Sequence, residues 1–446
     1  MSSSPTPLRL AGIGCGPRTR TYLSLASKQP QRYQIVGATD LKPHRVEQLH
    51  ALCGKPEPFL RFDSAEALLA VERFADVVVI GTQDADHVGP CLKAMERGYD
   101  VLLEKPAGVN AREVLRLEEA SRQLGRKVMI CHVLRYTPFY RQVKAIVDSG
   151  VLGDIVSVHA TEGVGPWHQA HSFVRGHWAD TTKAAPMIIA KCCHDLDILC
   201  WLLNRPCESV SSVGGLHYFT QANAPVGATA RCTDGCPEVG RCFYDAHRYL
   251  DEHRGWLKQV YDHTDTAGDD VILAWLRESP WGRCVYQADN NAVDRQIVQM
   301  NFSGGVLAEL TMTAFDHGRS IEIRGTHGVL RGGDPYKRAA GHDIAVELFR
   351  GGLTHYDLAV PHGGYAGHGG GDSGLVHALY DEMRQPDPAA MTSSLPVSVA
   401  SHLIGFAAEQ SRLTGHPIQL DAFRQSQLAL RTTGDGRPYP HNGSLR

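Results

Sequence analysis

The chain has 446 residues, a length that accommodates two or three domains of ordinary size. Lys and Arg together number 45 and Asp and Glu 48, so the formal net charge of −3 offers no electrostatic attraction for nucleic acid or an anionic membrane. Hydrophobic residues make up 43% of a chain in which no run of about 18 apolar residues predicts a transmembrane helix. We therefore expect neither nucleic acid nor a membrane as a partner.

The cysteines and the N-terminal segment both favour a cytoplasmic protein. The first residues, MSSSPTPLRL, do not form a basic segment followed by an apolar stretch, as a signal peptide would. Among the 12 cysteines, Cys15 lies in a glycine-rich loop, and Cys91 and Cys131 lie in apolar patterns. Such positions are typical of buried free thiols in a reducing compartment rather than of a secreted disulfide framework.

The first third of the chain alternates short apolar strands with helices. The strands are predicted at 8–13, 33–39, 75–80, 99–103 and 127–131, and the helices at 18–28, 43–53, 87–97 and 112–124. The β-branched run that ends at Ile80 is typical of a parallel strand buried on both faces. This alternation predicts an α/β fold whose N-terminal domain, residues 1–133, is a doubly wound parallel sheet of the Rossmann type.

The rest of the chain, residues 134–446, follows another pattern. Strand-like runs are predicted at 155–162, 296–302, 307–314 and 320–324, and helices at 138–150, 192–204 and 395–414. The strands are joined by Ser303-Gly304-Gly305 and by a polar turn around His317-Gly318, which predicts an antiparallel, open-faced sheet. The glycine-rich residues 363–374 are predicted to be a loop. Because a bare sheet face is costly in water, we expect a homodimer or homotetramer.

A glycine-rich loop between the first strand and the first helix predicts a dinucleotide site. The loop residues are Gly12, Ile13, Gly14, Cys15 and Gly16. Glycines permit the tight turn and the close approach of a pyrophosphate, and the helix N-terminus offers free N–H groups to that anion. Pro17 stands where the usual pattern has its third glycine, so we expect Gly16 to replace it through a shift of the loop.

Asp40 ends the second predicted strand, where a carboxylate accepts the ribose hydroxyls of NAD and repels the 2′-phosphate of NADP. The alternative is that Asp40 only caps the next helix. Lys42 and Arg45 lie nearby, and Arg45 is also a candidate cofactor contact. NAD is therefore the predicted cofactor, and NADP the less favoured one.

Three further motifs carry a family resemblance: Thr82-Gln-Asp-Ala-Asp-His87, Glu104-Lys105-Pro106, and Arg135-Tyr136-Thr-Pro138. Together they resemble the glucose–fructose oxidoreductase, inositol dehydrogenase and MocA family (Gfo/Idh/MocA) over nearly the whole chain, apart from an insertion at about 218–290. The family implies NAD or NADP, sugar or polyol substrates, and a second domain with a large, mostly antiparallel sheet that is often used for oligomerisation.

The resemblance also implies roles for the motif residues. Thr82, His87, Glu104, Lys105 and Arg135 are expected beside the cofactor, and Lys105 also beside the substrate hydroxyl. Alcohol oxidation needs a hydride acceptor and a group that manages the hydroxyl proton, and a lysine at the carboxyl edge of a parallel sheet can hydrogen-bond that hydroxyl.

The family's second signature, Asp-x-x-x-His-x-x-Asp, is matched only in part by residues 190–197. His194 and Asp197 match, whereas Ala190 holds the position of the first aspartate, and Lys191 follows it. We predict His194 as a general acid/base, Asp197 as the group that orients it, and Lys191 as a further catalytic group. The alternative is a purely structural His–Asp pair.

Two other clusters are candidates for binding. His168, His171, Arg175 and Trp178 combine aromatic faces with hydrogen-bonding groups, which suits a carbohydrate, although a surface loop with incidental histidines is the alternative. In the insertion, Cys232, Cys236, Cys242 and His247 are the weak zinc candidates, because their spacing is not a strong zinc pattern and free or paired thiols are favoured over a metal.

Three functions remain open from the sequence. The favoured one is an NAD-dependent dehydrogenase of a sugar or polyol. The second is a glycoside hydrolase or lyase that retains NAD and works by transient oxidation of the sugar followed by elimination. The third is an NAD-binding sensor without catalysis.

Overall fold

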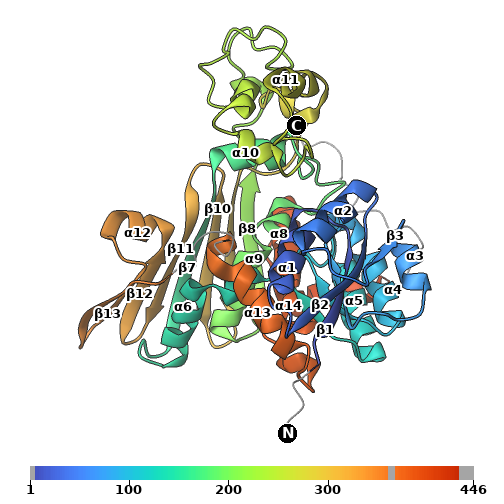
Figure 1. Ribbon diagram of the computed structural model, residues 1–446. Coiled ribbons are helices and arrows are strands. Elements are labelled where there is room, and N and C mark those ends of the chain that lie inside the picture. The colour runs from blue at the N-terminus through green and yellow to red at the C-terminus, as the bar shows by residue number, and fades with distance from the viewer. Residues whose placement is uncertain (1–5, 360–366, 431–446) are drawn as a thin grey trace.

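The computed structural model describes residues 6–359 and 367–430, which form two sheets with their helices and a smaller segment that protrudes from one end (Figure 1). The N-terminal sheet has six parallel strands in the order β3-β2-β1-β4-β5-β6. Its strands are β1 (Leu8–Ile13), β2 (Tyr33–Thr39), β3 (Leu60–Phe62), β4 (Val77–Ile80), β5 (Asp100–Leu103) and β6 (Val128–Ile130). Its helices are α1 (Pro17–Ser27), α2 (Pro43–Leu52), α3 (Ala65–Ala70), α4 (Val88–Glu96) and α5 (Ala111–Leu124). The predicted Rossmann sheet is confirmed.

This strand order places the functional edge of the sheet. The order reverses between β1 and β4, and in such sheets ligands bind at the carboxyl ends of the strands on either side of that reversal. The prediction missed β3 and α3. Because Leu60 and Arg61 are exposed, β3 has no apolar pattern that would identify it as a strand.

The second sheet has nine strands in the order β14-β13-β12-β11-β7-β10-β9-β8-β15 and is antiparallel except where β7 pairs with β10. Its strands are β7 (Ile155–Val164), β8 (Cys207–Gly215), β9 (Arg295–Phe302), β10 (Val306–Thr313), β11 (His317–Gly325), β12 (Gly328–Gly333), β13 (Ile344–Leu348), β14 (Gly352–Tyr356) and β15 (Ile418–Gln419). The mostly antiparallel sheet is therefore confirmed. The turn predicted around His317-Gly318 lies directly before these residues, at 314–316, and both residues already belong to β11.

The face of the large sheet away from its helices is mainly polar. Along β9, exposed and buried residues alternate, and the exposed ones include Arg295, Gln299 and Asn301. Val213 is 66%, Ile297 39% and Leu307 55% exposed, and Val213 and Ile297 lie opposite one another in neighbouring strands. The hydrophobic argument for oligomerisation through this face therefore rests on a few residues.

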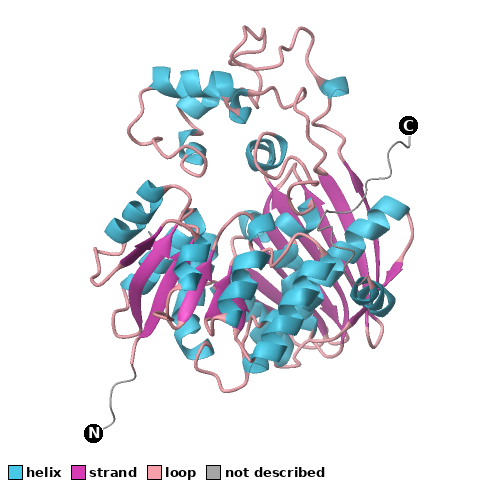
Figure 2. Ribbon diagram, turned by 90° about the vertical axis from the view of Figure 1, so that its right-hand side faces the viewer, coloured by secondary structure: helices cyan, strands magenta, loops and turns pink. Residues whose placement is uncertain are grey.

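Helices from the second half pack against both sheets (Figure 2). They are α6 (Pro138–Asp148), α9 (Cys193–Leu203), α12 (Asp334–Ala340), α13 (Gly371–Glu382), α14 (Leu395–Thr414) and α15 (Leu420–Ala429). α14 contacts β8 of the large sheet and α5 of the Rossmann domain, and α13 lies against α1. Leu375 and Val376 of α13 share a buried cluster with Leu10 and Tyr33 of the Rossmann sheet.

Part of the predicted loop at 363–374 is helical. Residues 363–366 lie outside the described residues, residues 367–370 form a 3₁₀ turn, and α13 begins at Gly371. The loop prediction is therefore wrong for residues 371–374. Glycine content alone favoured a loop, whereas the helix is stabilised by packing of Leu375 and Leu379 against the Rossmann sheet.

Residues 216–294 join the neighbouring strands β8 and β9 and form the protruding segment, which we call the insertion (Figure 1). It carries α10 (Arg254–Leu257) and α11 (Asp269–Glu278). Tyr249, Leu257, Ile272 and Leu276 are fully buried in a small core of its own that Trp167 joins from the body of the protein. Among the described helices, none is long and apolar enough to cross a membrane.

Candidate functional site

The glycine loop has the geometry that the sequence predicts for binding an anion. Gly16 is the N-cap residue of α1, no side chain caps the helix, and Pro17 follows in the first turn. Gly14 has φ +78°, and a Cβ there would lie 3.0 Å from the Gly81 carbonyl oxygen and from the Thr82 nitrogen. The helix N-terminus therefore keeps free N–H groups beside a backbone that only glycine can form, which fits a dinucleotide pyrophosphate. Pro17 does not disturb this arrangement, because proline is suited to a first helical turn.

Asp40 lies directly beside this loop. Its Oδ2 accepts a hydrogen bond from the Cys15 nitrogen at 2.6 Å, and its Oδ1 accepts one from the Lys42 nitrogen at 2.8 Å. The carboxylate at the end of β2 is thus fixed next to the glycine loop, where it fits a ribose with free hydroxyls. Arg45 does not face the cofactor loop in this way, because its guanidinium binds Asp262 of the insertion.

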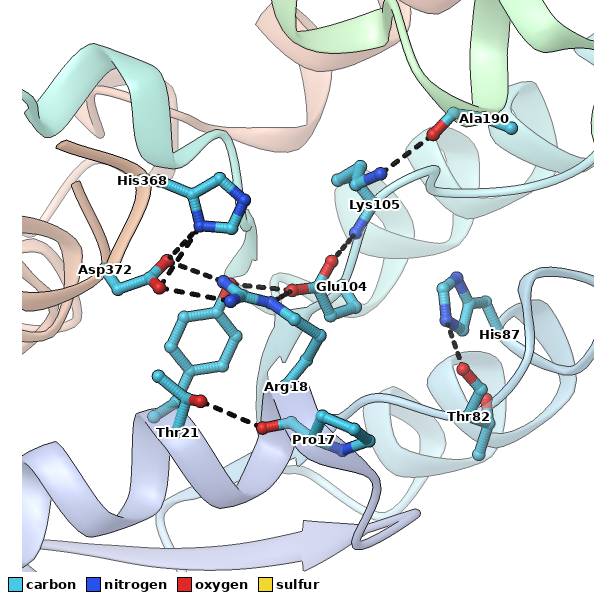
Figure 3. A network of polar contacts seen from close by, with 11 residues as sticks. Pro17, Arg18, Thr21, Thr82, His87, Glu104, Lys105, Ala190, His368 and Asp372 are labelled. Atoms are coloured by element: carbon cyan, nitrogen blue, oxygen red, sulfur yellow. Dashed lines mark hydrogen bonds and ion pairs between the residues drawn. The ribbon is translucent and has the colours of Figure 1, made fainter. Parts of the chain in front are cut away.

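Lys105 stands at the carboxyl end of β5. The Glu104 nitrogen continues the sheet by donating to the Ile80 carbonyl, and the Lys105 nitrogen donates to Glu104 Oε2 at 2.8 Å. Lys105 Nζ reaches across to the second half of the chain and donates to the Ala190 carbonyl at 2.8 Å (Figure 3). Ala190 ends the short helix α8 (Met187–Ala190). Lys105 is therefore held by the backbone carbonyl of Ala190, the residue that stands where the family signature has an aspartate.

The side chains of His87 and Thr82 contact backbone carbonyls at the carboxyl edge of the Rossmann sheet. His87 is 1% exposed, with Nδ1 2.7 Å from the Pro106 carbonyl and Nε2 3.2 Å from the Thr82 carbonyl (Figure 3). Because both partners are carbonyl oxygens, which only accept, each contact is a hydrogen bond when the facing ring nitrogen carries a proton. Thr82 Oγ1 donates to the Asp86 carbonyl at 3.0 Å. The cofactor contacts of both side chains stay predictions, and His87 fixes the turn after Lys105.

An arginine that the sequence analysis did not single out joins the site to the C-terminal segment. Arg18 Nε lies 2.9 Å from Glu104 Oε1, and Arg18 Nη2 lies 2.6 Å from Asp372 Oδ1 (Figure 3). Tyr22 donates its hydroxyl to the same Glu104 oxygen at 2.7 Å. Burial raises the pKa of Glu104, but Arg18 and Lys105 outweigh it and hold that pKa below its usual range. His368, which binds Asp372 at 3.0 Å, extends the network.

His194 is buried close to these groups. Its Nδ1 has no hydrogen-bond partner, and its ring lies 5.8 Å from that of His132 and 6.2 Å from that of His368. Burial, and then the positive charge of Lys105, lowers the pKa of His194 well below its ordinary value. The imidazole is therefore neutral at neutral pH and is a weaker base than an ordinary histidine, whereas the sequence analysis expected a general acid/base.

Lys191 belongs to a partly buried cluster of charges with Glu162, Asp195 and Arg319. Its Nζ lies 3.3 Å from Glu162 Oε1, Arg319 lies 2.8 Å from Glu162 Oε2, and Arg319 also binds Asp195 at 2.7 Å. Burial lowers the pKa of Lys191, and it raises that of Asp195 in spite of the nearby Arg319. Lys191 is thus a buried ammonium balanced by Glu162.

Two predicted site residues instead bind one another. Asp197 does not orient His194, because Arg135 holds both of its oxygens, Nε at 2.6 Å and Nη2 at 2.7 Å. Arg135 is 2% exposed and also donates to the Thr392 carbonyl. The predicted role of Asp197 beside His194 is therefore wrong, and the cofactor contact of Arg135 stays a prediction. The two residues form a buried ion pair that fixes α9 against the segment that follows β6.

The four residues predicted to bind substrate separate into different environments. His168 is close enough to Lys191 and Lys105 for their charges to add to burial, which together lower its pKa to about 2. Trp178 Nε1 donates to Asp84 Oδ2 at 2.8 Å and so contacts the loop after β4. His171 Nδ1 is 2.7 Å from the Tyr249 hydroxyl, within the core that supports the insertion.

Arg175 is likewise structural. It is 3% exposed and donates to the carbonyls of Arg283 and Tyr244 in the insertion at 2.7 and 2.6 Å. Arg175 and His171 therefore support the insertion, and their predicted contact with substrate stays a prediction. His168 is the member of the set that stays beside the lysines.

Family profiles match most of the chain. The profile described as "Oxidoreductase family, NAD-binding Rossmann fold" matches residues 8–132, and the GFO/IDH/MocA C-terminal domain matches residues 140–331. The chain belongs to the Gfo/Idh/MocA oxidoreductase family. The resemblance inferred from the Glu104-Lys105-Pro106 and neighbouring motifs is thereby confirmed.

Relatives within the Gfo/Idh/MocA family agree on the fold and on oxidoreductase chemistry. The chain is 24% identical over 415 residues to the Bacillus subtilis oxidoreductase YteT, covering 87% of this chain and 93% of that protein. It is 32% identical over 223 residues to inositol 2-dehydrogenase 4 of Saccharopolyspora erythraea, which is 50% of this chain and 61% of that enzyme.

Solved structures of similar fold include enzymes with bound dinucleotides. An Agrobacterium radiobacter oxidoreductase in complex with NAD+, L-tartaric acid and magnesium aligns with a TM-score of 0.65 at 15% identity, covering 94% of this chain and 99% of that one. The WlbA dehydrogenase of Bordetella pertussis in complex with NADH and UDP-GlcNAcA aligns with a TM-score of 0.64 at 16% identity, with the same coverage. At these identities the likeness establishes the fold.

The weak zinc candidates in the insertion of this Gfo/Idh/MocA protein are not arranged around a common point in the part of the chain that the structure describes. Cys232, Cys236 and Cys242 line one pocket together with Cys284, and each is a free thiol. His247 is instead bound to Asp245 at 2.8 Å. Within residues 6–359 and 367–430, no three His, Cys, Asp or Glu side chains are arranged to hold a metal ion.

Proposed function

We propose that this protein is an NAD-dependent dehydrogenase that transfers a hydride between the nicotinamide and a hydroxyl or ketone of a sugar or polyol. The observation that carries the proposal is Lys105. It stands at the carboxyl edge of the Rossmann sheet, with Nζ held 2.8 Å from the Ala190 carbonyl and with the unpartnered Nδ1 of His194 buried nearby. Further support comes from the glycine loop and from Asp40 beside it.

Different side chains carry out different parts of the proposed reaction. The nicotinamide, when bound, supplies the hydride acceptor. Lys105 has two N–H donors left after its bond to Ala190, and these bind the substrate oxygen and stabilise negative charge on it. His194, whose buried Nδ1 has no other hydrogen-bond partner, accepts the hydroxyl proton. Lys191 and His168 lie on the substrate side, where they hydrogen-bond further hydroxyls of a sugar or polyol.

A second candidate function is redox-assisted cleavage of a glycoside, in which the sugar is oxidised, the glycosidic substituent is eliminated, and the hydride returns. The observation in its favour is the density of imidazoles around His194, with His132 and His368 on two sides. Elimination needs acid and base groups beyond those that alcohol oxidation uses.

One experiment separates these candidates. The purified protein is denatured and its cofactor identified by mass spectrometry, and the native protein is then assayed for NADH absorbance with free sugars, polyols and aryl glycosides. NADH formed from a free sugar or polyol supports the dehydrogenase. Release of the aglycone without net NADH assigns the second function. A protein that holds NAD and turns over none of these compounds contradicts both and matches a sensor.

The proposal includes the cellular compartment and the oligomeric state of the enzyme. We infer that it acts in the cytoplasm, where its 12 free thiols persist, and that it forms a homodimer or homotetramer through the outer face of the large sheet. Val213, Ile297 and Leu307 would be the apolar contacts of that interface. Light scattering at micromolar concentration tests it, and a monomer would contradict it.

A further inference from the structure

One carboxylate of the insertion binds three basic side chains at the start of α2. Asp262 Oδ2 lies 3.2 Å from Lys42 Nζ and 3.1 Å from His44 Nε2, and Oδ1 lies 3.0 Å from Arg45 Nη2. The Asp262 side chain is 10% and that of Arg45 19% exposed, so this pair is largely enclosed, whereas Lys42 and His44 are 53% and 48% exposed. Burial raises the pKa of Asp262, but hydrogen bonds from Arg45 and Lys42 outweigh it and hold the pKa well below its usual range.

The three basic residues stand where a dinucleotide's adenosine ribose is recognised. Asp40, which closes the glycine loop, is followed within five positions by Lys42, His44 and Arg45. In doubly wound folds this segment, just beyond the second strand, distinguishes the free 2′-hydroxyl of NAD from the 2′-phosphate of NADP, and a basic side chain here accommodates the phosphate. Figure 1 shows α2 at the end of the Rossmann domain nearest to the insertion.

The charged side chains beside the expected ribose site affect the choice between NAD and NADP. Lys42 and Arg45 would make the segment attractive to a phosphate, in opposition to Asp40. Asp262 binds both of them. The two carboxylates, Asp40 and Asp262, then balance the formal charges of Lys42 and Arg45. A phosphate that approached this ribose would meet cations already bound to a carboxylate and a second carboxylate beside them.

We infer that Asp262 is a specificity residue of the cofactor site, which favours NAD over NADP by withholding Arg45 and Lys42 from a 2′-phosphate. The inference rests on the proposed function, because it assumes that the glycine loop binds a nicotinamide dinucleotide. The insertion thereby takes part in cofactor recognition, because its Asp262 binds Arg45 although the two residues are more than 200 positions apart in the sequence.

The test measures binding rather than turnover. Dissociation constants for NAD+ and NADP+ are determined by titration calorimetry on the full chain and on Asp262→Asn. The variant should bind NADP+ about tenfold more tightly relative to NAD+, because the charge-assisted contacts of Arg45 and Lys42 become available to the phosphate. The matched control is Asp265→Asn, which removes a carboxylate of the same segment that binds Lys258 at the surface, and it should leave the ratio unchanged.

A second substitution separates specificity from simple docking of the insertion. Arg45→Ala in the Asp262→Asn background should return the NADP+ to NAD+ ratio to near the wild-type value, whereas Arg45→Ala alone should not improve NADP+ binding. Asp262→Ser repeats the test if the asparagine variant does not fold. Equal weakening of both dinucleotides, or an unchanged ratio, would overturn the inference. Absence of binding of either dinucleotide to the wild-type protein would instead refute the proposed function.

Discussion

Replacing Arg18 by methionine should destabilise the protein by about 2–4 kcal/mol at pH 8. The substitution leaves Glu104 and Asp372, whose side chains are 8% and 4% exposed, without their cation. Loss of one partner from a fully buried ion pair costs about 3–5 kcal/mol. The Arg18 side chain is 31% exposed, so water reaches part of the site and reduces that figure.

The dependence of this loss on pH identifies its cause. In the wild type, burial raises the pKa values of Glu104 and Asp372, but Arg18 and Lys105 near Glu104, and His368 and Arg18 near Asp372, outweigh it and hold both pKa values below their usual range. Arg18 is the cation that both carboxylates share. Their contribution to stability is therefore fully present above about pH 4, the unfolded value, and is lost as the pH falls through the lowered folded values. In the variant, burial acts without that cation and raises both pKa values, so both carboxyls take up protons at higher pH. The deficit should shrink as the pH is lowered from about 8 to about 5.

The assay is urea unfolding followed by circular dichroism at several pH values, in which the midpoint of Arg18→Met should fall by roughly 1 M at pH 8. Arg9→Met is the matched control, because Arg9 also binds an aspartate, Asp76, at 2.9 Å, but the two side chains are 43% and 28% exposed. It should cost less than about 1 kcal/mol. A loss below about 0.5 kcal/mol for Arg18→Met, or a loss that does not vary with pH, would refute this reasoning.

Three further outcomes follow from the structure. Arg135→Met should cost about 3–5 kcal/mol in urea unfolding, because it leaves Asp197 charged and buried; a surface-like loss would contradict the buried pair. His194→Asn should lower turnover, yet NMR titration of the wild type should show no protonation of His194 near pH 6.5, because burial and Lys105 lower its pKa; a normal titration would contradict its assigned neutral state. Gly14→Ala should weaken dinucleotide binding at least about tenfold, measured by calorimetry, because a Cβ at φ +78° meets backbone atoms at 3.0 Å; unchanged affinity would exclude the loop as the binding site.

The sequence predicted those features that depend on local pattern. The β-branched run before Ile80 and the glycines around Gly14 identify the Rossmann unit, because burial on both faces and a tight turn each restrict the residues that fit. β8 was missed because Cys207–Gly215 contains three serines and two glycines and lacks a clean apolar alternation. Its place in the sheet is fixed by pairing with β9.

Ion pairs between residues far apart in the sequence could not be predicted from the spacing of residues along the chain. His194 and Asp197 lie three residues apart on α9, which favours a pair, but Arg135, 62 residues away in sequence, binds Asp197 instead. Arg18 and Asp372 are 354 residues apart, and no local signal connects them. The same holds for Asp262, whose meeting with Arg45 depends on how the insertion folds back over α2.

The central claim is that Lys105 manages the substrate hydroxyl in a nicotinamide-dependent reaction. The most direct measurement compares wild type with Lys105→Met for NAD+ affinity by calorimetry and for turnover of a substrate found in the sugar, polyol and glycoside panel. The account predicts NAD+ affinity within about threefold of wild type and turnover reduced about 100-fold or more, as expected for loss of a group that binds the substrate oxygen and stabilises negative charge on it. Unchanged turnover in the variant would contradict the account.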